Sequence, residues 1–314
     1  MSNRVFGIIN TQNTCFMNSV LQVLFNVSEL RRYIITLDHN HPMIQTFKKV
    51  LIYWEKNQEN KKVLLKSLCD SVYKHLQFDE GEQQDAHEFF YKFVDCIHEI
   101  TKKDVILRSN MTTRTGALVA CEQAWNKFCQ KNYSPIISTF YGQFKNIIEC
   151  PCSNKSVTRE HHCGISVDVS ENLLSSIDKY FEAQTIDGYN CDKCNTVQSV
   201  VQKRNIEIMP EIMVIQINRF MYNGMKNTRV LPFPITFNIA KYINKEFRVD
   251  ELTYSLVGIV CHYGNFQNSG HYNVIFKHSD GAWYLADDEH VQVMTQMPLD
   301  RIGSTAYMLF YRRL

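Results

Sequence analysis

The sequence predicts an α+β protein in which the helices come first and a sheet follows. Apolar residues recur three and four apart, the spacing of a helix, through roughly the first 130 residues. From residue 136 onward, the β-branched and aromatic runs typical of strands dominate. Such segregation of helices and strands along a chain is typical of an α+β architecture. We therefore expect a single domain over 1–314, with a helical part of about 1–135 and a sheet-containing part of about 136–314.

The helical part is expected to begin with a helix at Cys15. Apolar side chains follow at helical spacing, namely Phe16, Met17, Val20, Leu21, Val23 and Leu24. Similar patterns predict helices over 28–35, within 43–76, from a turn at 79–82 to about residue 100, and over 117–129. The helix after the turn has an apolar face formed by Phe89, Phe93, Val94 and Ile97. A charged, threonine-rich connection over 108–115 is expected to be mobile.

The second part of the chain is expected to form the sheet. Its strand signals lie over 139–144, 206–208, 213–217, 254–261, 272–277 and 308–311. A short helix is expected over 173–183, between the first two of these segments.

Composition and charge exclude several classes of protein. Hydrophobic residues at 45% and charged residues at 21% are ordinary for a globular domain. A net charge of +2 without a long basic block argues against a dedicated nucleic-acid or membrane-surface binder. The N-terminus lacks a signal-peptide pattern, and no apolar run reaches the length of a membrane span. We therefore expect an intracellular protein of the cytoplasm, the nucleus or both.

The cysteine count suits a reducing compartment. Eleven cysteines are too few to form a disulfide scaffold in a chain of 314 residues. They are better interpreted as one possible nucleophile, a metal-binding set and buried thiols.

Cys15 is the candidate nucleophile. Asn13 or Thr14 is a plausible N-cap, which places the thiol in the first turn of the helix. Free backbone N–H groups and the positive end of the helix dipole favour the thiolate there. The same N–H groups can hold an oxyanion, and Asn10 can add an amide donor. The alternative is that Cys15 is a small buried hydrophobic residue.

A second polar group lies in the stretch Gln83-Gln84-Asp85-Ala86-His87-Glu88. Asp85 and Glu88 are three residues apart, so they lie on one face at the start of a helix. The simplest interpretation is a favourable interaction of these charges with the helix dipole. Carboxylates are also natural partners for arginines on a substrate peptide.

Two cysteine pairs predict a metal site. Cys150 and Cys152 form one pair, and Cys191 and Cys194 form a C-x-x-C pair about forty residues later, an arrangement that suits tetrahedral zinc. The C-x-C pair is short for a zinc turn, so Cys163 or a nitrogen of the His161–His162 pair can substitute for one of its sulfurs. The alternative is a ribbon whose thiols hold no metal. A thiol oxidoreductase is disfavoured because the C-x-x-C pair lacks a βαβ context.

Cysteine chemistry also needs a general base and a group that orients it. Among eleven histidines, His271 stands out because it follows a flexible loop over 264–270 and opens an apolar strand. A tight hairpin closed at 280–281 would set Asp287 opposite Val274, roughly 10 Å along the strand from His271. A direct His271–Asp287 bond therefore requires a bulge, a bend or a longer turn.

Several of these stretches together resemble the ubiquitin-specific protease family. The stretch over 7–22, which contains Asn10 and Cys15, resembles the family's cysteine box, and 83–89 resembles its Gln-Gln-Asp box. Gly270-His271-Tyr272 and the stretch from Trp283 to Asp287-Asp288 resemble its histidine box. The stretches 210–220, 231–234 and 306–311 and the Phe140-x-Gly142 triplet also resemble the family. The resemblance spans Gly7 to Tyr311.

The resemblance implies a fold and an activity. The fold would be papain-like, with a helical thumb, a β-sheet palm and zinc-ribbon-like β fingers that cradle ubiquitin. The activity would be that of a cysteine-type deubiquitinase, which cuts the bond after the C-terminal glycine of ubiquitin. Its partners would be ubiquitin and ubiquitinated proteins, its zinc would be structural, and we expect a monomer.

The resemblance also implies roles for individual residues. Cys15 would be the nucleophile, His271 the base and Asp287 the residue that orients it. Asn10 would stabilise the oxyanion, and Asp288 would be a backup or a partner on the oxyanion side. The implied substrate-binding residues are Gln84, Asp85 and Glu88, which would meet the basic tail of ubiquitin, and Gly270 and Tyr272, which would narrow the channel. The implied metal ligands are Cys150, Cys152, Cys191 and Cys194. His262 also matches a family position, which belongs to a loop over the substrate channel, so we interpret it as structural.

Two positions differ from the family pattern and leave a second function open. Gln12 stands where the family prefers glycine, and Ala286 stands where an aromatic residue is usual. A turn that needs positive φ at Gln12 would carry modest strain. The alternative function is therefore a catalytically weak or inactive ubiquitin-binding scaffold of the same fold. A nucleic-acid adaptor built on a zinc ribbon is disfavoured by the near-neutral charge.

Overall fold

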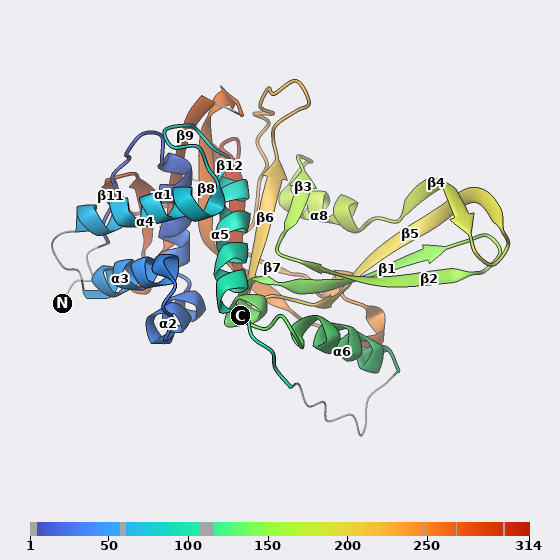
Figure 1. Cartoon of the computed structure of the whole chain (residues 1–314). Helices are drawn as coiled ribbons and strands as arrows, with labels where there is room; N and C mark the ends of the chain where they lie inside the picture. The colour runs from blue at the N-terminus through green and yellow to red at the C-terminus, as the bar shows by residue number, and fades with distance from the viewer. Residues whose placement is uncertain (1–4, 57–60, 107–115, 248, 268, 298) are drawn as a thin grey trace.

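A block of helices packs against one side of a long sheet, and a narrower sheet extends from the other side (Figure 1). The computed structural model describes residues 5–56, 61–106, 116–247, 249–267, 269–297 and 299–314. The connection expected over 108–115 lies outside the described residues.

Except for the last of them, the helices of the first part form where the apolar spacing predicts them. They are α1 (Cys15–Phe25), α2 (Ser28–Thr36), α3 (Pro42–Lys56), α4 (Lys61–Leu76), α5 (Ala86–Thr101), α6 (Gly116–Cys129) and α7 (Pro135–Phe140). Every residue of α1 is buried, because this helix lies between α5 and the sheet. A helix that is buried on all sides can hold the residue at its N-terminus in a fixed place.

The predicted strand over 139–144 is wrong at its start. Residues up to Phe140 belong to α7, and strand β1 begins only at Gly142. Pro135 occupies the first turn of α7, where its fixed φ suits a helix start. Ile136, Ile137 and Phe140 are buried at helical spacing, so packing overrides the strand preference of this β-branched stretch.

The large sheet is the centre of the second part. Its strand order is β11-β10-β9-β8-β12-β6-β3, and β7 pairs with β8. The strands are β3 (Ile165–Asp168), β6 (Ile212–Asn218), β7 (Thr236–Asn238), β8 (Thr253–Phe266), β9 (Ser269–Lys277), β10 (Trp283–Asp287), β11 (His290–Met294) and β12 (Ala306–Arg313). β3 and β6 are parallel, and the other pairs in this sheet are antiparallel. The strands predicted over 213–217, 254–261, 272–277 and 308–311 are confirmed as parts of β6, β8, β9 and β12.

The small sheet is antiparallel and has the order β2-β1-β5-β4. Its strands are β1 (Gly142–Glu149), β2 (Lys155–His162), β4 (Gln184–Cys191) and β5 (Thr196–Ile208), so the predicted strand over 206–208 is the end of a longer one. At its base, the buried Glu207 carboxylate accepts hydrogen bonds from Arg159 Nε at 2.6 Å and from the side chains of Gln143 and Asn244. This buried charge is both paired and hydrogen-bonded, which offsets the cost of removing it from water.

The remaining elements are short. They are α8 (Leu173–Phe181), which contacts β3 and β5, the 3₁₀ turns η1 (Ala240–Tyr242) and η2 (Lys245–Phe247), and α9 (Leu299–Ile302). The helix predicted over 173–183 is therefore confirmed, with an end two residues earlier. Among the described helices, none is long and apolar enough to cross a membrane.

The large sheet separates two apolar cores. Met308 and Phe310 of β12 face the helical block, whereas Leu309 and Tyr311 face the core that contains α8. This alternation is that of a strand buried on both faces. On the helical side, the rings of Phe16 and Phe89 meet edge to face at 5.7 Å, which joins α1 to α5. The buried face predicted for α5, formed by Phe89, Phe93, Val94 and Ile97, is confirmed.

Candidate active site

A strained turn precedes Cys15 at the start of α1. Gln12 and Asn13 have φ values of 64° and 65°, so the positive φ anticipated at Gln12 is present. Thr14 occupies the N-cap position but makes no side-chain cap. Instead, its backbone N–H donates to Asn10 Oδ1 at 2.9 Å, so Asn10 closes the turn over the helix start.

His271 and Asp287 are in direct contact. His271 Nε2 donates to Asp287 Oδ1 at 2.5 Å, although the two residues lie on different strands, β9 and β10. The β9–β10 register pairs Ala286 with Val274, one residue away from the predicted pairing, because the turn between the strands is longer than a tight hairpin. Asp287 thus lies just beyond the paired part of β9 and β10, where its side chain can reach back to the imidazole.

Cys15 and Asp287 favour the protonated, positively charged form of His271. A hydrogen bond with the Cys15 side chain raises the pKa of His271, and Asp287 adds to this, so that the pKa is about 9 despite partial burial. Since Nε2 is engaged by Asp287, Nδ1 is the ring nitrogen left to face Cys15. The arrangement therefore joins a thiol, an imidazole and a carboxylate in the order that cysteine nucleophiles require.

Asp288 is turned toward Asn10 and the start of α1. Its Oδ2 accepts from Asn10 Nδ2 at 2.9 Å, and its Oδ1 accepts from Asn18 Nδ2 at 2.8 Å. Its backbone carbonyl accepts from the N–H of Ile8 at 2.8 Å. The distance from Asp288 Oδ2 to His271 Nε2 is 4.0 Å, which is too long for a hydrogen bond. Asp288 therefore anchors the segment that carries Asn10, and Asp287 is the direct partner of the imidazole.

The acidic residues at the start of α5 have different surroundings. Asp85 Oδ1 caps α5 by accepting from the N–H groups of His87 at 2.8 Å and Glu88 at 3.0 Å. Asp85 Oδ2 accepts from the hydroxyl of Tyr307. Both oxygens of Asp85 are thus used inside the protein, as its helix-dipole interpretation anticipates. Glu88 is exposed and pairs with Lys92 at 2.7 Å, and Gln84 lies partly exposed beside Asp85.

Gly270 and Tyr272 flank the candidate base in β9. Gly270 has a φ of 155°, and a Cβ there would lie 2.3 Å from the carbonyl oxygen of Tyr263, so only glycine fits. Tyr272 is buried, and this burial raises the pKa of its hydroxyl well above the usual value. Its ring meets the ring of His262 edge to face at 4.7 Å.

His262 is buried and uncharged at neutral pH. Burial lowers the pKa of His262 to about 4, and the charges of Lys226 and His271 add to this effect. The side chain packs against Phe220 as well as Tyr272. A histidine in this state fits the structural interpretation and not a second base.

Sequence reasoning missed Gln83, whose side chain contacts the residue before His271. Its Nε2 donates to the carbonyl of Gly270 at 3.0 Å, and its Oε1 accepts from the N–H of Gly270 at 2.8 Å. Gln83 and Gly270 are 187 residues apart. The sequence carried no signal for this contact, because nothing in the Gln-Gln-Asp stretch indicates that Gln83 lies beside Gly270.

The structure brings the four cysteines of the two pairs together. Their sulfur atoms all lie within 4.8 Å of one another, with separations of 3.3 Å for Cys152–Cys150, 3.7 Å for Cys152–Cys191 and 3.9 Å for Cys150–Cys194. A tetrahedron with Zn–S bonds of about 2.3 Å has sulfurs about 3.8 Å apart, so the cluster can bind a structural metal such as zinc. Gln198 Nε2 donates to Cys150 Sγ at 2.7 Å, the kind of contact that orients metal ligands.

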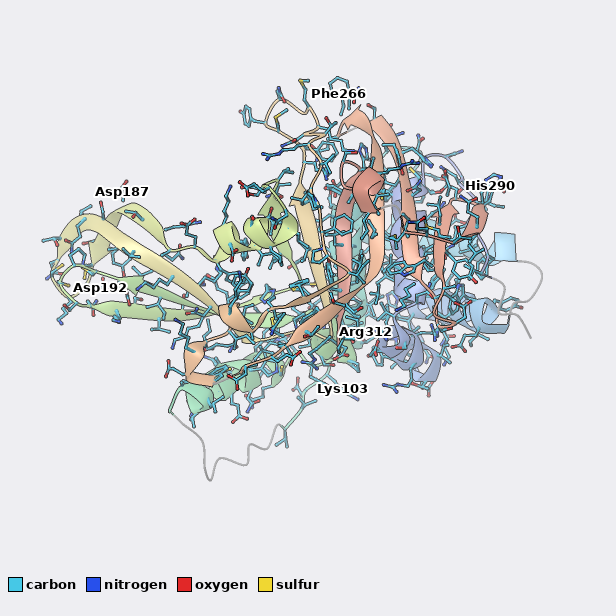
Figure 2. All side chains as sticks on the ribbon, turned by 180° about the vertical axis from the view of Figure 1, so that it is seen from behind. Lys103, Asp187, Asp192, Phe266, His290 and Arg312 are labelled. Atoms are coloured by element: carbon cyan, nitrogen blue, oxygen red, sulfur yellow. The ribbon has the colours of Figure 1, made fainter. Side chains whose placement is uncertain are left out.

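The substitute ligands considered for this cluster lie elsewhere. Cys163 is buried in the core of the helical block. His161 stacks on Phe128 and His162 stacks on Phe144, each with ring centroids 3.7 Å apart. The cluster itself is remote from the catalytic side: Figure 2 shows Asp192, between Cys191 and Cys194, at the outer end of the small sheet and His290, next to the Asp288 turn, on the opposite side of the molecule.

The sequence also matches a known protein family. Residues 6–311 match the profile of the family described as ubiquitin carboxyl-terminal hydrolase. The chain belongs to this family. The resemblance to its ubiquitin-specific protease members is thereby confirmed over nearly the whole chain.

The relatives of this hydrolase family member are distant and longer. It is 27% identical over 328 residues to ubiquitin carboxyl-terminal hydrolase 36 of Drosophila pseudoobscura pseudoobscura and 26% identical over 324 residues to the protein of the same name from Drosophila melanogaster. Each match covers 97% of this chain and 29% of the relative, so the chain spans less than a third of their length.

Solved structures confirm the fold of the hydrolase domain. The SAGA DUB module containing Ubp8, bound to monoubiquitin, has a chain that matches with a TM-score of 0.80 at 26% identity, over 100% of this chain and 70% of that chain. The same module bound to ubiquitin aldehyde matches with a TM-score of 0.80 at 23% identity, over 100% and 71% of the two chains. The predicted α+β fold with thumb, palm and fingers is therefore confirmed, and the cysteine cluster is consistent with zinc-binding fingers.

Proposed function

We propose that this chain is a deubiquitinating thiol protease that hydrolyses the peptide or isopeptide bond after the C-terminal glycine of ubiquitin. The observation that carries the proposal is the direct His271–Asp287 hydrogen bond, with the Cys15 side chain as the other partner of His271. Membership of the hydrolase family supports the choice of ubiquitin as substrate.

The reaction is acyl transfer in two steps. The Cys15 sulfur attacks the carbonyl carbon of the terminal glycine, and protonated His271 gives its proton to the departing lysine amine, which leaves a thioester on Cys15. His271 then takes a proton from water, the resulting hydroxide attacks the thioester, and the ubiquitin carboxylate leaves while Cys15 is restored. Asp287 holds Nε2 and stabilises the imidazolium during both steps.

The oxyanion is assigned to Asn10 and the N–H of Cys15. One N–H of the Asn10 amide donates to Asp288, and an amide nitrogen carries a second hydrogen that can donate to the substrate oxygen. Asn10 is held at both ends, by Asp288 and by the N–H of Thr14, so the donor does not have to reorganise when charge develops.

Substrate binding is assigned to the start of α5 and to the loop before β9. Glu88 is an exposed carboxylate that can meet a basic peptide tail, and Gln84 and Asp85 lie beside it. Because both Asp85 oxygens have partners within the protein, we assign the ionic contact with the basic tail of ubiquitin mainly to Glu88. Gly270 and Tyr272 would restrict the channel to a tail of two glycines.

The cysteine cluster is assigned to a structural zinc ion. Cys150, Cys152, Cys191 and Cys194 would supply all four ligands, so the metal would be closed to substrate and serve only to stabilise the tip of the small sheet. No step of the reaction involves this site.

The partners we propose are ubiquitin and ubiquitinated proteins, in the cytoplasm, the nucleus or both. We propose a monomer and no role in binding nucleic acid or membranes, which accords with the net charge of +2. The SAGA DUB module, whose Ubp8-containing structure this chain resembles, was solved bound to monoubiquitin, which supports ubiquitin as partner here.

The proposal is tested with ubiquitin that carries a thiol-reactive group at its C-terminus. We expect the wild-type chain to form a covalent adduct and to cleave ubiquitin from a lysine, and Cys15→Ser to do neither while still binding ubiquitin. Cys96→Ser, which changes a partly buried thiol on α5, is the matched control and should react like the wild type. A wild-type chain that binds ubiquitin but forms no adduct would be the catalytically inactive scaffold instead.

A further inference from the structure

The loop between α4 and α5 contacts the segments that carry both Cys15 and His271, the candidate catalytic pair. On one side, the carbonyl of Gly81 accepts from Asn13 Nδ2 at 2.8 Å, in the turn that leads to Cys15. On the other side, Gln83 makes its two hydrogen bonds to Gly270, the residue before His271. The loop is itself anchored, because Asp85 caps α5 and accepts from Tyr307 of β12.

Gly270 lies where the β8–β9 ladder is interrupted. Tyr263 pairs with His271 and Phe266 pairs with Ser269, so two residues of β8, Gly264 and Asn265, face the single residue Gly270. Such a bulge disrupts the ladder locally. The amide of Gln83 meets both polar groups of Gly270 there, as a neighbouring strand would.

The backbone at Gly270 has little freedom to compensate for the loss of this contact. Its φ is 155°, and the position of a Cβ lies 2.5 Å from His262 Nε2. The peptide that follows Gly270 leads directly into His271, so a rotation of this peptide would swing the imidazole.

We propose that Gln83 is a positioning residue that closes the β8–β9 bulge and thereby holds His271 in line with Cys15. It does not contact the reacting atoms and acts through the backbone of Gly270. The expected effect on turnover rests on the proposed function, whereas the claim that Gln83 holds His271 in line with Cys15 does not depend on it.

A role for Gln83 in binding substrate is less compatible with its contacts. Its carbonyl oxygen and its amide nitrogen both have partners in Gly270. A substrate peptide would have to displace a two-point contact with a backbone whose own groups would then lose their partners.

The test compares Gln83→Met, which keeps the length of the side chain but removes the amide, with Gln83→Glu, which keeps an acceptor for the Gly270 N–H. Gln123→Met, on the exposed surface of α6, makes the same chemical change at a remote position and is the control. For Gln83→Met we expect kcat on a fluorogenic ubiquitin substrate to fall roughly 10- to 100-fold with little change in KM, since misplacement of a catalytic group acts on the chemical step. Gln83→Glu should recover part of the loss, and Gln123→Met should match the wild type.

A second measurement is independent of ubiquitin. The rate of alkylation of Cys15 by iodoacetamide, followed by mass spectrometry of its peptide, is measured from pH 5 to pH 10. A thiol aligned with an imidazolium reacts at low pH, so we expect Gln83→Met to need a higher pH for the same rate and Gln83→Glu to lie between the two.

The outcomes separate the inference from the proposed function. A wild-type kcat and a wild-type alkylation profile in Gln83→Met would overturn the inference, and so would a raised KM with unchanged kcat, which indicates substrate binding. If Gln83→Met does not fold, the comparison of Gln83→Glu with the wild type decides in the same way. If the wild-type chain does not cleave ubiquitin, the proposed function fails, while the alkylation profiles still test whether Gln83 aligns the pair.

Discussion

His271 contacts a thiol on one side and a carboxylate on the other. The neighbouring carboxylates Asp287 and Asp288 have different partners. Asp287 accepts from the imidazole of His271 at 2.5 Å, whereas Asp288 accepts from the side chains of Asn10 and Asn18. Asp287 is the last residue of β10, and Asp288 lies in the turn that follows with a positive φ of 50°, so the two side chains meet different neighbours. Substitution of the two residues therefore tests two different functions.

Asp287→Asn is expected to be the more damaging of the two substitutions. Loss of the carboxylate removes control of the imidazole tautomer and stabilisation of the imidazolium, which costs on the order of 10⁴-fold in kcat in a comparable triad. Asp288→Asn should be milder, because it loosens Asn10 without removing the direct partner of His271. Turnover of a fluorogenic ubiquitin substrate by both variants is the measurement, at matched folding stability. A larger loss in Asp288→Asn would exchange the two roles.

The pH dependence of turnover should reflect the raised pKa of His271. The contact with Cys15, with a further contribution from Asp287, raises this pKa to about 9, so the imidazole stays protonated at neutral pH and loses its proton only as the pH rises through this value. We expect kcat/KM to fall above about pH 9, because neutral imidazole cannot protonate the leaving amine. In Asp287→Asn one of the contacts that raises the pKa is lost, so this alkaline limb should move to lower pH. An alkaline limb at the same pH in both proteins would contradict the assignment.

At the scale of elements, the segment over 7–10 is docked against the turn that follows β10. A Cβ on Gly7 would lie 2.2 Å from the carbonyl oxygen of Glu289 and 2.5 Å from that of Asp288. In the same segment, the backbone N–H of Ile8 donates to the carbonyl oxygen of Asp288. Asn10 is therefore placed by close backbone packing as well as by its own hydrogen bonds.

Gly7→Ala should lower activity more than it lowers stability. The added methyl group would push the segment away from the 288–289 turn and displace Asn10 from the oxyanion site, which we expect to reduce kcat/KM roughly 10- to 100-fold, the scale of a small misplacement. Gly116→Ala is the matched control, because a Cβ there meets nothing within 4 Å. Steady-state kinetics and thermal unfolding of both variants provide the comparison, and an unchanged kcat/KM in Gly7→Ala would show that the segment tolerates the displacement.

At the scale of the whole molecule, the candidate catalytic residues and the cysteine cluster lie in different parts of the fold. The triad candidates Cys15, His271 and Asp287 lie on α1, β9 and β10, whereas the cluster lies at the outer end of β1, β4 and β5 (Figure 2). Outside the small apolar cluster around Cys150, Cys191 and Val200, the tip of the small sheet has few buried side chains to stabilise it. A metal ion is the kind of cross-link that stabilises such a small extension.

The purified chain is expected to contain about one zinc ion, which a combined Cys191→Ala and Cys194→Ala substitution should remove. Loss of the metal should unfold the tip of the small sheet and weaken ubiquitin cleavage, while alkylation of Cys15 by a small reagent should continue at the wild-type rate. Cys96→Ala serves as the control with zinc retained. Metal analysis together with both reactivity measurements tests this, and a wild-type protein without zinc would refute it.

Much of the fold and part of the site were predictable from local patterns. The helical spacing after Cys15 identified α1, and the apolar runs identified the cores of β6, β8, β9 and β12. These predictions depend on the period of burial along a few consecutive residues, which the sequence carries directly. The pattern failed over 139–140, where a β-branched stretch has a helical burial pattern that only its packing partners reveal.

The sequence alone determined which side chains are available and the elements that carry them: Cys15 at the start of a helix, His271 in a strand, and the two cysteine pairs. It placed the start of that strand two residues late, because β9 already begins at Ser269. Only the tertiary structure decided how they meet. It set the register that brings Asp287 to His271, chose Cys150 and Cys152 over Cys163 as neighbours of Cys191, and placed Gln83 on Gly270 across 187 residues. Periodicity and capping depend on residues a few positions apart, whereas these contacts depend on turn length, a strand bulge and the packing of whole elements, none of which a local pattern records.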